Sequence, residues 1–139
     1  MSLRETIFAA IEATVTAACP LASVERMPSG DMQPGTEIAI FDGPMRRVSG
    51  EVGSVRREIS FRIEGSVAGG DGAEAHAALN TLHAAVVDCL IADPTLGDLV
   101  EWIEDGEVNF DLIPLADLRG LFFSQNFTVQ FSAPRGLLS

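Results

Sequence analysis

Apolar residues recur at helical spacing in two segments of the chain. The stripe in the first segment consists of Leu3, Ile7, Ile11 and Val15. Ser2 and Glu5 have the spacing of a capping box, in which a hydroxyl and a carboxylate satisfy backbone donors at a helix start. Because proline cannot continue a helix, we predict that this helix starts at Ser2 and ends at Cys19-Pro20.

The second helical segment covers Ala73–Asp93 and is followed by Pro94. Its predicted inner face consists of Leu79, Leu82, Val86 and Leu90. Alanines flank this face, favour the helix and permit close packing. We therefore expect a second long helix that packs against the rest of the protein.

Alternation of polar and apolar residues predicts strands between and after these helices. The longest is Val55–Val67, where Ile59, Phe61 and Ile63 alternate with charged residues, and a turn at Gly50–Ser54 connects it to its partner. The other predicted strands are Ala22–Met27, Glu37–Phe41, Met45–Val52, Val108–Leu112 and Leu121–Ser132, with a short segment at Val100–Glu104. A loop is expected after Met27.

The order of elements predicts the fold class. One helix, three or four strands, a second helix and two or three strands are typical of an α+β protein. We expect two main helices packed on one face of a mainly antiparallel sheet of four to six strands. With 139 residues, of which 47% are hydrophobic, the chain is expected to form a single domain, residues 1–139.

Composition argues against several classes of partner. Nine basic residues stand against 20 acidic ones, giving a formal charge of −11 and a pI near 4.4, which opposes nucleic-acid binding. No apolar run reaches the roughly 18 residues of a membrane span, and the start of the chain lacks the pattern of a signal peptide. We expect a soluble cytoplasmic protein without specific nucleic-acid or membrane partners.

Candidate catalytic and metal chemistry is weak. His76 and His83 lie about 10.5 Å apart along the predicted helix axis, too far to share one ion readily. Cys19 and Cys89 have no metal or redox spacing, so we expect buried free thiols. The glycine-rich stretch Gly65–Gly72 lacks the ending of a phosphate-binding loop. We expect no enzyme activity, no metal and no cofactor.

Charge is distributed unevenly along the chain. All basic residues are arginines; several lie in the predicted hairpin, whereas no basic residue lies between Arg62 and Arg119 and acidic residues accumulate there. A solvated surface explains this equally well. The alternative is a head-to-tail contact between subunits, since such contacts close into rings and arginine pairs bidentately with carboxylates. Its candidate residues are Arg46, Arg47, Arg56, Arg57, Glu101, Glu104, Asp105 and Glu107.

Residues 76–103, HAALNTLHAAVVDCLIADPTLGDLVEWI, resemble a helix followed by a D-P-T-L-G turn in one family of virion proteins. The family comprises the tail terminators, or minor tail protein U-like proteins, of long-tailed phages, prophages and phage-like gene transfer agents. The V-E-R-x-P segment at Val24–Pro28 is similar to its opening. The ending LFFSQNFTVQFSAPRGLLS is similar to its closing strand and tail.

The resemblance implies a virion structural protein and no catalysis. Such a protein assembles as a ring, typically a hexamer, either in isolation or only on the tail. It caps the tail tube, ends tail polymerisation and offers the surface where the head connector docks. Its implied partners are itself, the tail tube protein and the head connector protein. Its implied location is the bacterial host cytoplasm during assembly and then the virion tail. Two alternatives stay open: another neck or tail-completion protein, and a small ligand-binding α+β regulatory domain.

Overall fold

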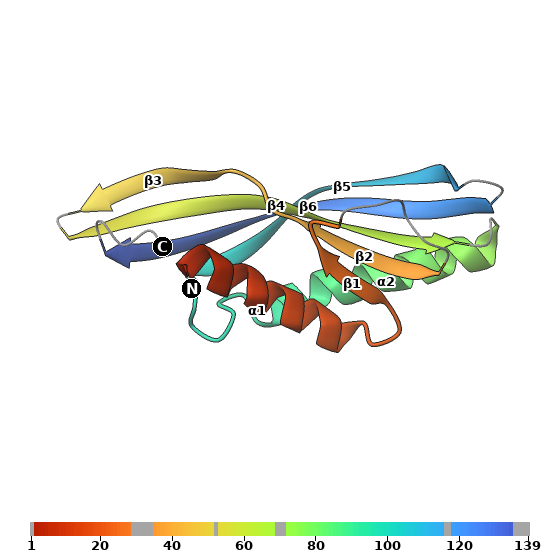
Figure 1. Cartoon of the computed structure of the whole chain (residues 1–139), viewed down its shortest axis with the longest axis horizontal. Coiled ribbons are helices and arrows are strands. Elements are labelled where there is room, and N and C mark those ends of the chain that lie inside the picture. The colour runs from red at the N-terminus through yellow and green to blue at the C-terminus, as the bar shows by residue number, and fades with distance from the viewer. Residues whose placement is uncertain (1, 29–34, 52, 69–71, 116–117, 135–139) are drawn as a thin grey trace.

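The structure, a computed structural model, describes residues 2–28, 35–51, 53–68, 72–115 and 118–134. The loop predicted after Met27 lies mostly in residues 29–34, outside this range. The elements are, in order, α1 (Leu3–Ala18), β1 (Ser23–Arg26), β2 (Thr36–Phe41), β3 (Met45–Glu51), β4 (Ser54–Ala68), α2 (Ala73–Ala92), β5 (Trp102–Leu115) and β6 (Leu118–Pro134). Figure 1 shows both helices on one face of a long twisted sheet. The predicted α+β class is confirmed.

Helix α1 forms as its sequence predicts. The Ser2 hydroxyl accepts a hydrogen bond from the Glu5 amide at 3.0 Å, and the helix ends at Cys19. The residues of α1 that are buried against the sheet are Ile7, Phe8, Ile11 and Val15. This four-residue repeat therefore fixes which face of α1 packs on the sheet.

The sheet has the strand order β1-β2-β4-β6-β5, and β3 pairs with β4 as well. Strands β1 and β2 are parallel, whereas the remaining pairs are antiparallel. The predicted mainly antiparallel sheet is therefore confirmed, at the upper end of the predicted strand number.

Strands β2 and β3 lie one after the other along the same edge of β4. Strand β2 pairs with Arg62–Val67 of β4, and β3 pairs with Ser54–Ile59 of β4. The segment Asp42-Gly43-Pro44 separates the two strands, and the Ser60 amide donates to the Pro44 carbonyl at 3.0 Å. A Cβ atom at Gly43 would lie 1.8 Å from the Ser60 carbonyl oxygen, so the close approach of this junction to β4 requires glycine.

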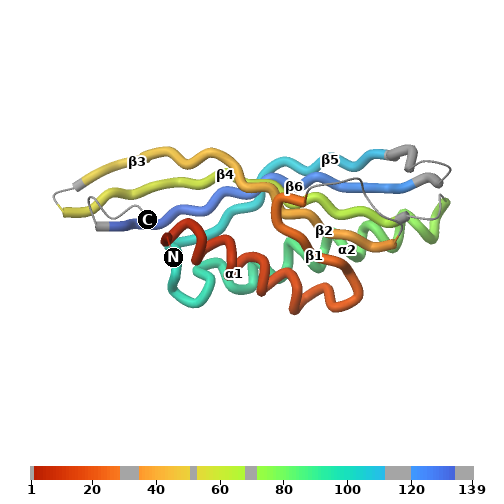
Figure 2. The backbone as a smooth tube through the Cα atoms, viewed as in Figure 1, coloured from red at the N-terminus to blue at the C-terminus, as the bar shows by residue number. Residues whose placement is uncertain are grey.

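Strand β6 runs beside β4 for the whole length of β4, from the pair Ser54–Pro134 to the pair Ala68–Gly120. Strand β5 accompanies β6 only as far as Gln130. The part of the sheet that contains β3 consists of β3 with Ser54–Ile59 of β4 and Val129–Pro134 of β6, and β5 reaches only its first two β6 positions, Val129 and Gln130. We call this three-stranded extension the arm. Figure 2 shows that it projects beyond the start of α1.

The core lies between the helices and the sheet. Leu79, Val86 and Leu90 of α2 are buried as predicted, while Leu82 is only half-buried. The ring of Phe61 stacks on Phe127 with centroids 5.3 Å apart. The apolar stripe predicted for α2 is thus a packing face, as that of α1 is.

Two sequence predictions need correction. Val100–Glu104 and Val108–Leu112 are not separate segments, because β5 runs without interruption from Trp102 to Leu115, with a register shift between Asp105 and Val108. Gln125 of β6, although polar, is 2% exposed and lies on the helix-covered face. Cys19 is buried and free as expected, whereas Cys89 is only half-buried.

Candidate interaction surface

The sheet face opposite the helices is polar. Along β4 this face carries Arg56, Glu58, Arg62 and Glu64, because their neighbours of opposite parity pack against the helices. Along β6 it carries Ser124, Asn126, Thr128, Gln130 and Ser132. A face of this composition suits contact with water or with another polar surface rather than with a further core layer.

Two arginines of the arm have carboxylate partners within the chain. Arg46 binds Glu58 at 2.9 Å, and Gln130 donates to the other oxygen of Glu58 at 3.1 Å. The hydrogen bond from Gln130 and the charge of Arg46 lower the pKa of Glu58. These contacts connect the three strands of the arm on its polar face.

Arg56 and Glu101, both candidates for a contact between subunits, form an ion pair within one chain. Arg56 Nε lies 3.1 Å from Glu101 Oε2, and the Ser132 hydroxyl donates to Glu101 as well. This pair ties the segment that leads into β5 to β4 within the arm. Arg46 and Arg56, two of the four predicted arginines, therefore have carboxylate partners within the chain.

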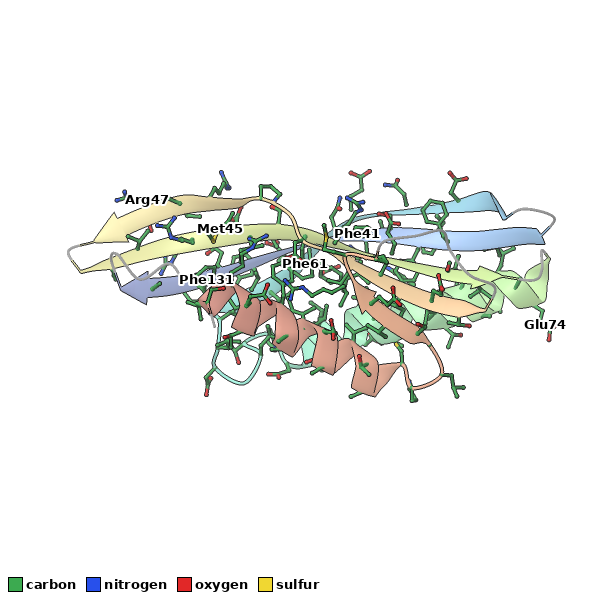
Figure 3. The ribbon with its side chains drawn as sticks, in the orientation of Figure 1. Phe41, Met45, Arg47, Phe61, Glu74 and Phe131 are labelled. Atoms are coloured by element: carbon green, nitrogen blue, oxygen red, sulfur yellow. The ribbon has the colours of Figure 1, made fainter. Side chains whose placement is uncertain are left out.

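Arg47 and Arg57 differ from Arg46 and Arg56 in their surroundings. They lie directly opposite each other in the β3–β4 register. Arg47 is exposed and Arg57 half-buried, and among the described side chains no carboxylate lies within ion-pair distance of either. Figure 3 shows Arg47 on β3 of the arm, with Phe131 on β6 near the start of α1. The arm therefore carries two adjacent positive charges that this part of the chain leaves uncompensated.

Three of the four predicted acidic residues lie on the edge strand β5. Glu104, Asp105 and Glu107 are exposed, and no ion pair forms at them among the described residues. They flank the bulge between Asp105 and Val108. A bulge bends its strand and redirects its side chains, so this edge is shaped differently from a regular strand.

Buried Gln125 holds the bulge in place, a contact that the sequence did not reveal. Its Nε2 donates to the carbonyl of Gly106 at 2.8 Å, and its Oε1 lies 2.8 Å from His83 Nε2. The hydrogen-bond pattern assigns the proton to His83 Nε2. The His83 ring packs edge-on against Phe110 and Phe123. Helix α2, β6 and the β5 bulge are thus joined by one polar network inside an apolar layer.

Arg26 of β1 binds carboxylates of α1 and of the junction between β2 and β3, which we call the root of the arm. Its guanidinium binds Glu5 at 2.8 and 2.9 Å and Asp42 at 2.8 and 3.2 Å, and it lies 4.9 Å from the Phe8 ring centroid. The hydrogen bond from Arg26 lowers the pKa of Glu5. Arg4 donates to the Gly43 carbonyl at 2.8 Å. Helix α1 is therefore anchored at the junction between β2 and β3.

A hollow of about 320 Å³ opens beside this junction. Its lining residues are Phe41, Asp42, Gly43, Pro44, Ser60, Phe61, Arg62, Asn126, Phe127 and Thr128. The Arg62 guanidinium lies 4.3 Å from the Phe41 ring centroid and 2.9 Å from Glu64. Both charged side chains of the lining therefore have partners, because Asp42 binds Arg26 and Arg62 binds Glu64.

The candidate metal residues are not brought together. His76 is exposed, and His83 has its structural role at Gln125. Within the described residues no group of three His, Cys, Asp or Glu side chains is arranged to hold an ion. Burial raises the pKa of Cys19, and it raises that of Cys89 to about 11.

Helix α2 is long and apolar enough to cross a membrane by length and composition alone. Its inner residues pack into the core of this domain, and core helices meet the same criterion.

An apolar groove of about 280 Å³ lies between α2 and the end of α1. The groove is lined by Ala18, Cys19, Pro20, Leu21, Ala22, Thr36, Val67, Ala78, Thr81, Leu82 and Ala85.

Two solved structures are similar to this chain over most of its length. The first is a chain of the "Virion of native gene transfer agent (GTA) particle", with TM-score 0.50 and 18% identity, covering 93% of this chain and 92% of that chain. The second carries only a sequence identifier as its name and matches with TM-score 0.46 and 19% identity, over 92% and 96% of the two chains. No protein-family model and no curated protein matches the sequence. The first likeness shows a common α+β fold.

Proposed function

We propose that this chain is a structural protein of a phage-like particle, and that it caps the tail tube as a ring, ends tail polymerisation and provides the surface for head joining. The observation that carries the proposal is the fold shared with a virion chain of a gene transfer agent over 93% of this chain. The sequence resemblance of residues 76–103 to tail terminators supports the same role.

The arm and the acidic edge suit a protein that assembles with its own copies. The arm is a narrow extension with exposed positive charge, and β5 is an edge strand with exposed negative charge. Contacts between two different surfaces of one chain repeat around an axis, and they close into a ring where the rotation between neighbours divides a full turn. In this proposal the arm of each subunit reaches its neighbour or the tube end.

The charge balance is compatible with a ring through which DNA passes. A net charge of −11 repels the phosphate backbone, so DNA passing a surface of this charge would not adhere to it. Catalysis has no part in this role, and the proposed protein needs no cofactor. Its proposed partners are its own copies, the tube protein of the same particle and the head connector.

The proposal is tested by electron microscopy and light scattering of the purified chain over a concentration series, with and without Mg²⁺, which screens repulsion between carboxylates. Tubes assembled from the tube protein of the same particle are then added. Rings at tube ends, and tubes whose growth stops when the chain is added, are expected. A chain that binds neither end of the tube and leaves its growth unchanged would contradict the proposal.

The apolar groove beside α2 favours a second candidate, a small ligand-binding domain. Apolar, concave sites with few polar groups are typical of small-molecule binding. Native mass spectrometry of the purified chain tests this candidate. A retained small molecule that is lost when Ala85 is replaced by Phe would support binding in the groove, whereas an unliganded mass would argue against it.

A further inference from the structure

We propose that Arg47 and Arg57 form an acceptor site for carboxylates, and that its occupant is the acidic bulge of a second copy of this chain, contributed by Glu104, Asp105 and Glu107. This inference rests on the self-assembly in the proposed function and names the residues that make the contact. It separates them from Arg46, Arg56 and Glu101, which have partners within the chain.

The first argument is the cost of the arginine pair. Like charges directly opposite each other on neighbouring strands destabilise a sheet. The adjacent register pair, Arg46 and Glu58, has complementary charges and forms an ion pair at 2.9 Å. Arg47 and Arg57 occupy the next register position without a described carboxylate. A carboxylate from outside this part of the chain would remove the repulsion.

The second argument is that the Arg47 guanidinium lies against the strand backbone. A Cβ atom at Gly50 would lie 2.3 Å from Arg47 Nη2, so the guanidinium rests on the bare backbone of Gly50. The register shift between Arg47 and Ser49 brings Arg47 and Gly50 to this contact. Val48, between them in sequence, is 43% exposed and adds apolar surface beside the charges.

The third argument is the match with β5. The bulge backbone is held by Gln125, which reduces the conformational freedom that three exposed carboxylates lose on binding. Arginine forks bind carboxylates bidentately, so two arginines can engage two of the exposed acids. The two surfaces thus have complementary charge, and the acidic one has a backbone held by hydrogen bonds.

The fourth argument is that one chain cannot make this contact by itself. Strands β3 and β5 are separated by β4 and β6, which places them about 14 Å apart across the sheet. The register also displaces Asp105, opposite Phe127, from Arg57, opposite Phe131. The partner surface must therefore come from a second copy. A polyanion is disfavoured because the chain carries 20 acidic residues against nine arginines.

The experiment uses two charge-reversed variants of the full chain, Arg47→Glu/Arg57→Glu and Glu104→Arg/Glu107→Arg. Sedimentation velocity over a concentration series measures self-association. Each variant alone is expected to associate at least about tenfold more weakly than wild type, the scale of one lost charge contact. An equimolar mixture is expected to associate again, because every contact in an alternating assembly then pairs opposite charges.

Two further variants act as controls. Arg46→Gln/Arg56→Gln removes the internally paired arginines and is expected to keep wild-type association. Gly50→Ala keeps all charges but displaces the Arg47 guanidinium, so it is expected to weaken association. Arg47→Gln/Arg57→Gln guards against misfolding of the reversed variant: relief of the repulsion should raise its unfolding midpoint while its association falls.

Several outcomes overturn the inference. They are a wild-type chain that stays monomeric throughout the series, a reversed variant that associates as wild type does, and a mixture that fails to restore association. Binding of short duplex DNA that is lost in Arg47→Gln/Arg57→Gln would assign the site to polyanions instead. Restored association in the mixture without any binding to tube ends supports this inference and contradicts the proposed function, so the two fail separately.

Discussion

Replacing Arg26 by Met tests whether its carboxylate contacts hold α1 to the root of the arm. The side chains of Arg26 and Asp42 are 20% and 18% exposed, so solvent screens their ion pair only in part. Hydrogen bonds to charged groups contribute about 1.5–3 kcal/mol each in net terms. Methionine has a side chain of similar length but lacks the guanidinium that lies 4.9 Å from the Phe8 ring centroid, while Arg4 stays 3.9 Å from Asp42. We expect a loss of about 2 kcal/mol of unfolding free energy.

Urea unfolding followed by circular dichroism measures this loss. With a slope of about 2 kcal/mol per M, the midpoint should fall by about 1 M while the slope stays unchanged. Arg26→Lys is the matched control: it keeps the charge, yet a single ammonium group cannot bind Glu5 and Asp42 bidentately at once. Its midpoint should lie between those of Met and wild type. A Met variant within about 0.3 M of wild type would refute the role assigned to Arg26.

The pH dependence gives an independent check. Because the pKa of Glu5 is lowered in the folded chain from its ordinary value of 4.5, its contribution is present above that value and is lost as the pH falls through the folded pKa. Arg26 is the first cause of this shift. The difference in stability between wild type and Arg26→Met should therefore narrow below about pH 4.5. A difference that stays constant down to acid unfolding would contradict this account.

Three further predictions concern single sites. Gly43→Ala should lower stability by at least about 2 kcal/mol in urea unfolding, because its Cβ would overlap the Ser60 carbonyl; wild-type stability would contradict the junction geometry. Gln125→Leu should destabilise by about 1 kcal/mol and speed amide exchange in the β5 bulge, since it removes the partner of His83; unchanged exchange would count against the network. Cys89, with a pKa of about 11 against an ordinary 9.0, should react with a thiol reagent roughly 100-fold more slowly than a free cysteine at pH 7; equal rates would contradict its burial.

Local patterns were sufficient to predict most of the elements. The stripe of α1 and the alternation of β4 each depend on residues close in sequence, and both were predicted within one or two residues of their observed bounds. The bulge of β5 was missed because Gly106 and Glu107 interrupt the alternation, while the pairing with β6 that carries the strand across them is nonlocal.

The candidate contact was predicted only in outline. Arg46, Arg47, Arg56 and Arg57 are close in sequence, but whether each has a partner depends on register and on distant segments. The partner of Arg56, Glu101, lies 45 positions along the chain. A charge run therefore predicted where positive charge gathers, whereas the strand register determined which two arginines remain available.

Strands β4 and β6 continue from the helix-covered body into the arm without a break. Hydrogen bonds between antiparallel strands lie perpendicular to the strand direction. A force that pulls the arm along its length therefore loads the whole β4–β6 ladder in shear, with all of its bonds sharing the load. Peeling would instead break them one after another at much lower force. The arm is thus mechanically suited to transmit tension along its axis, and it is weakest against a load that lifts β3 sideways from the edge.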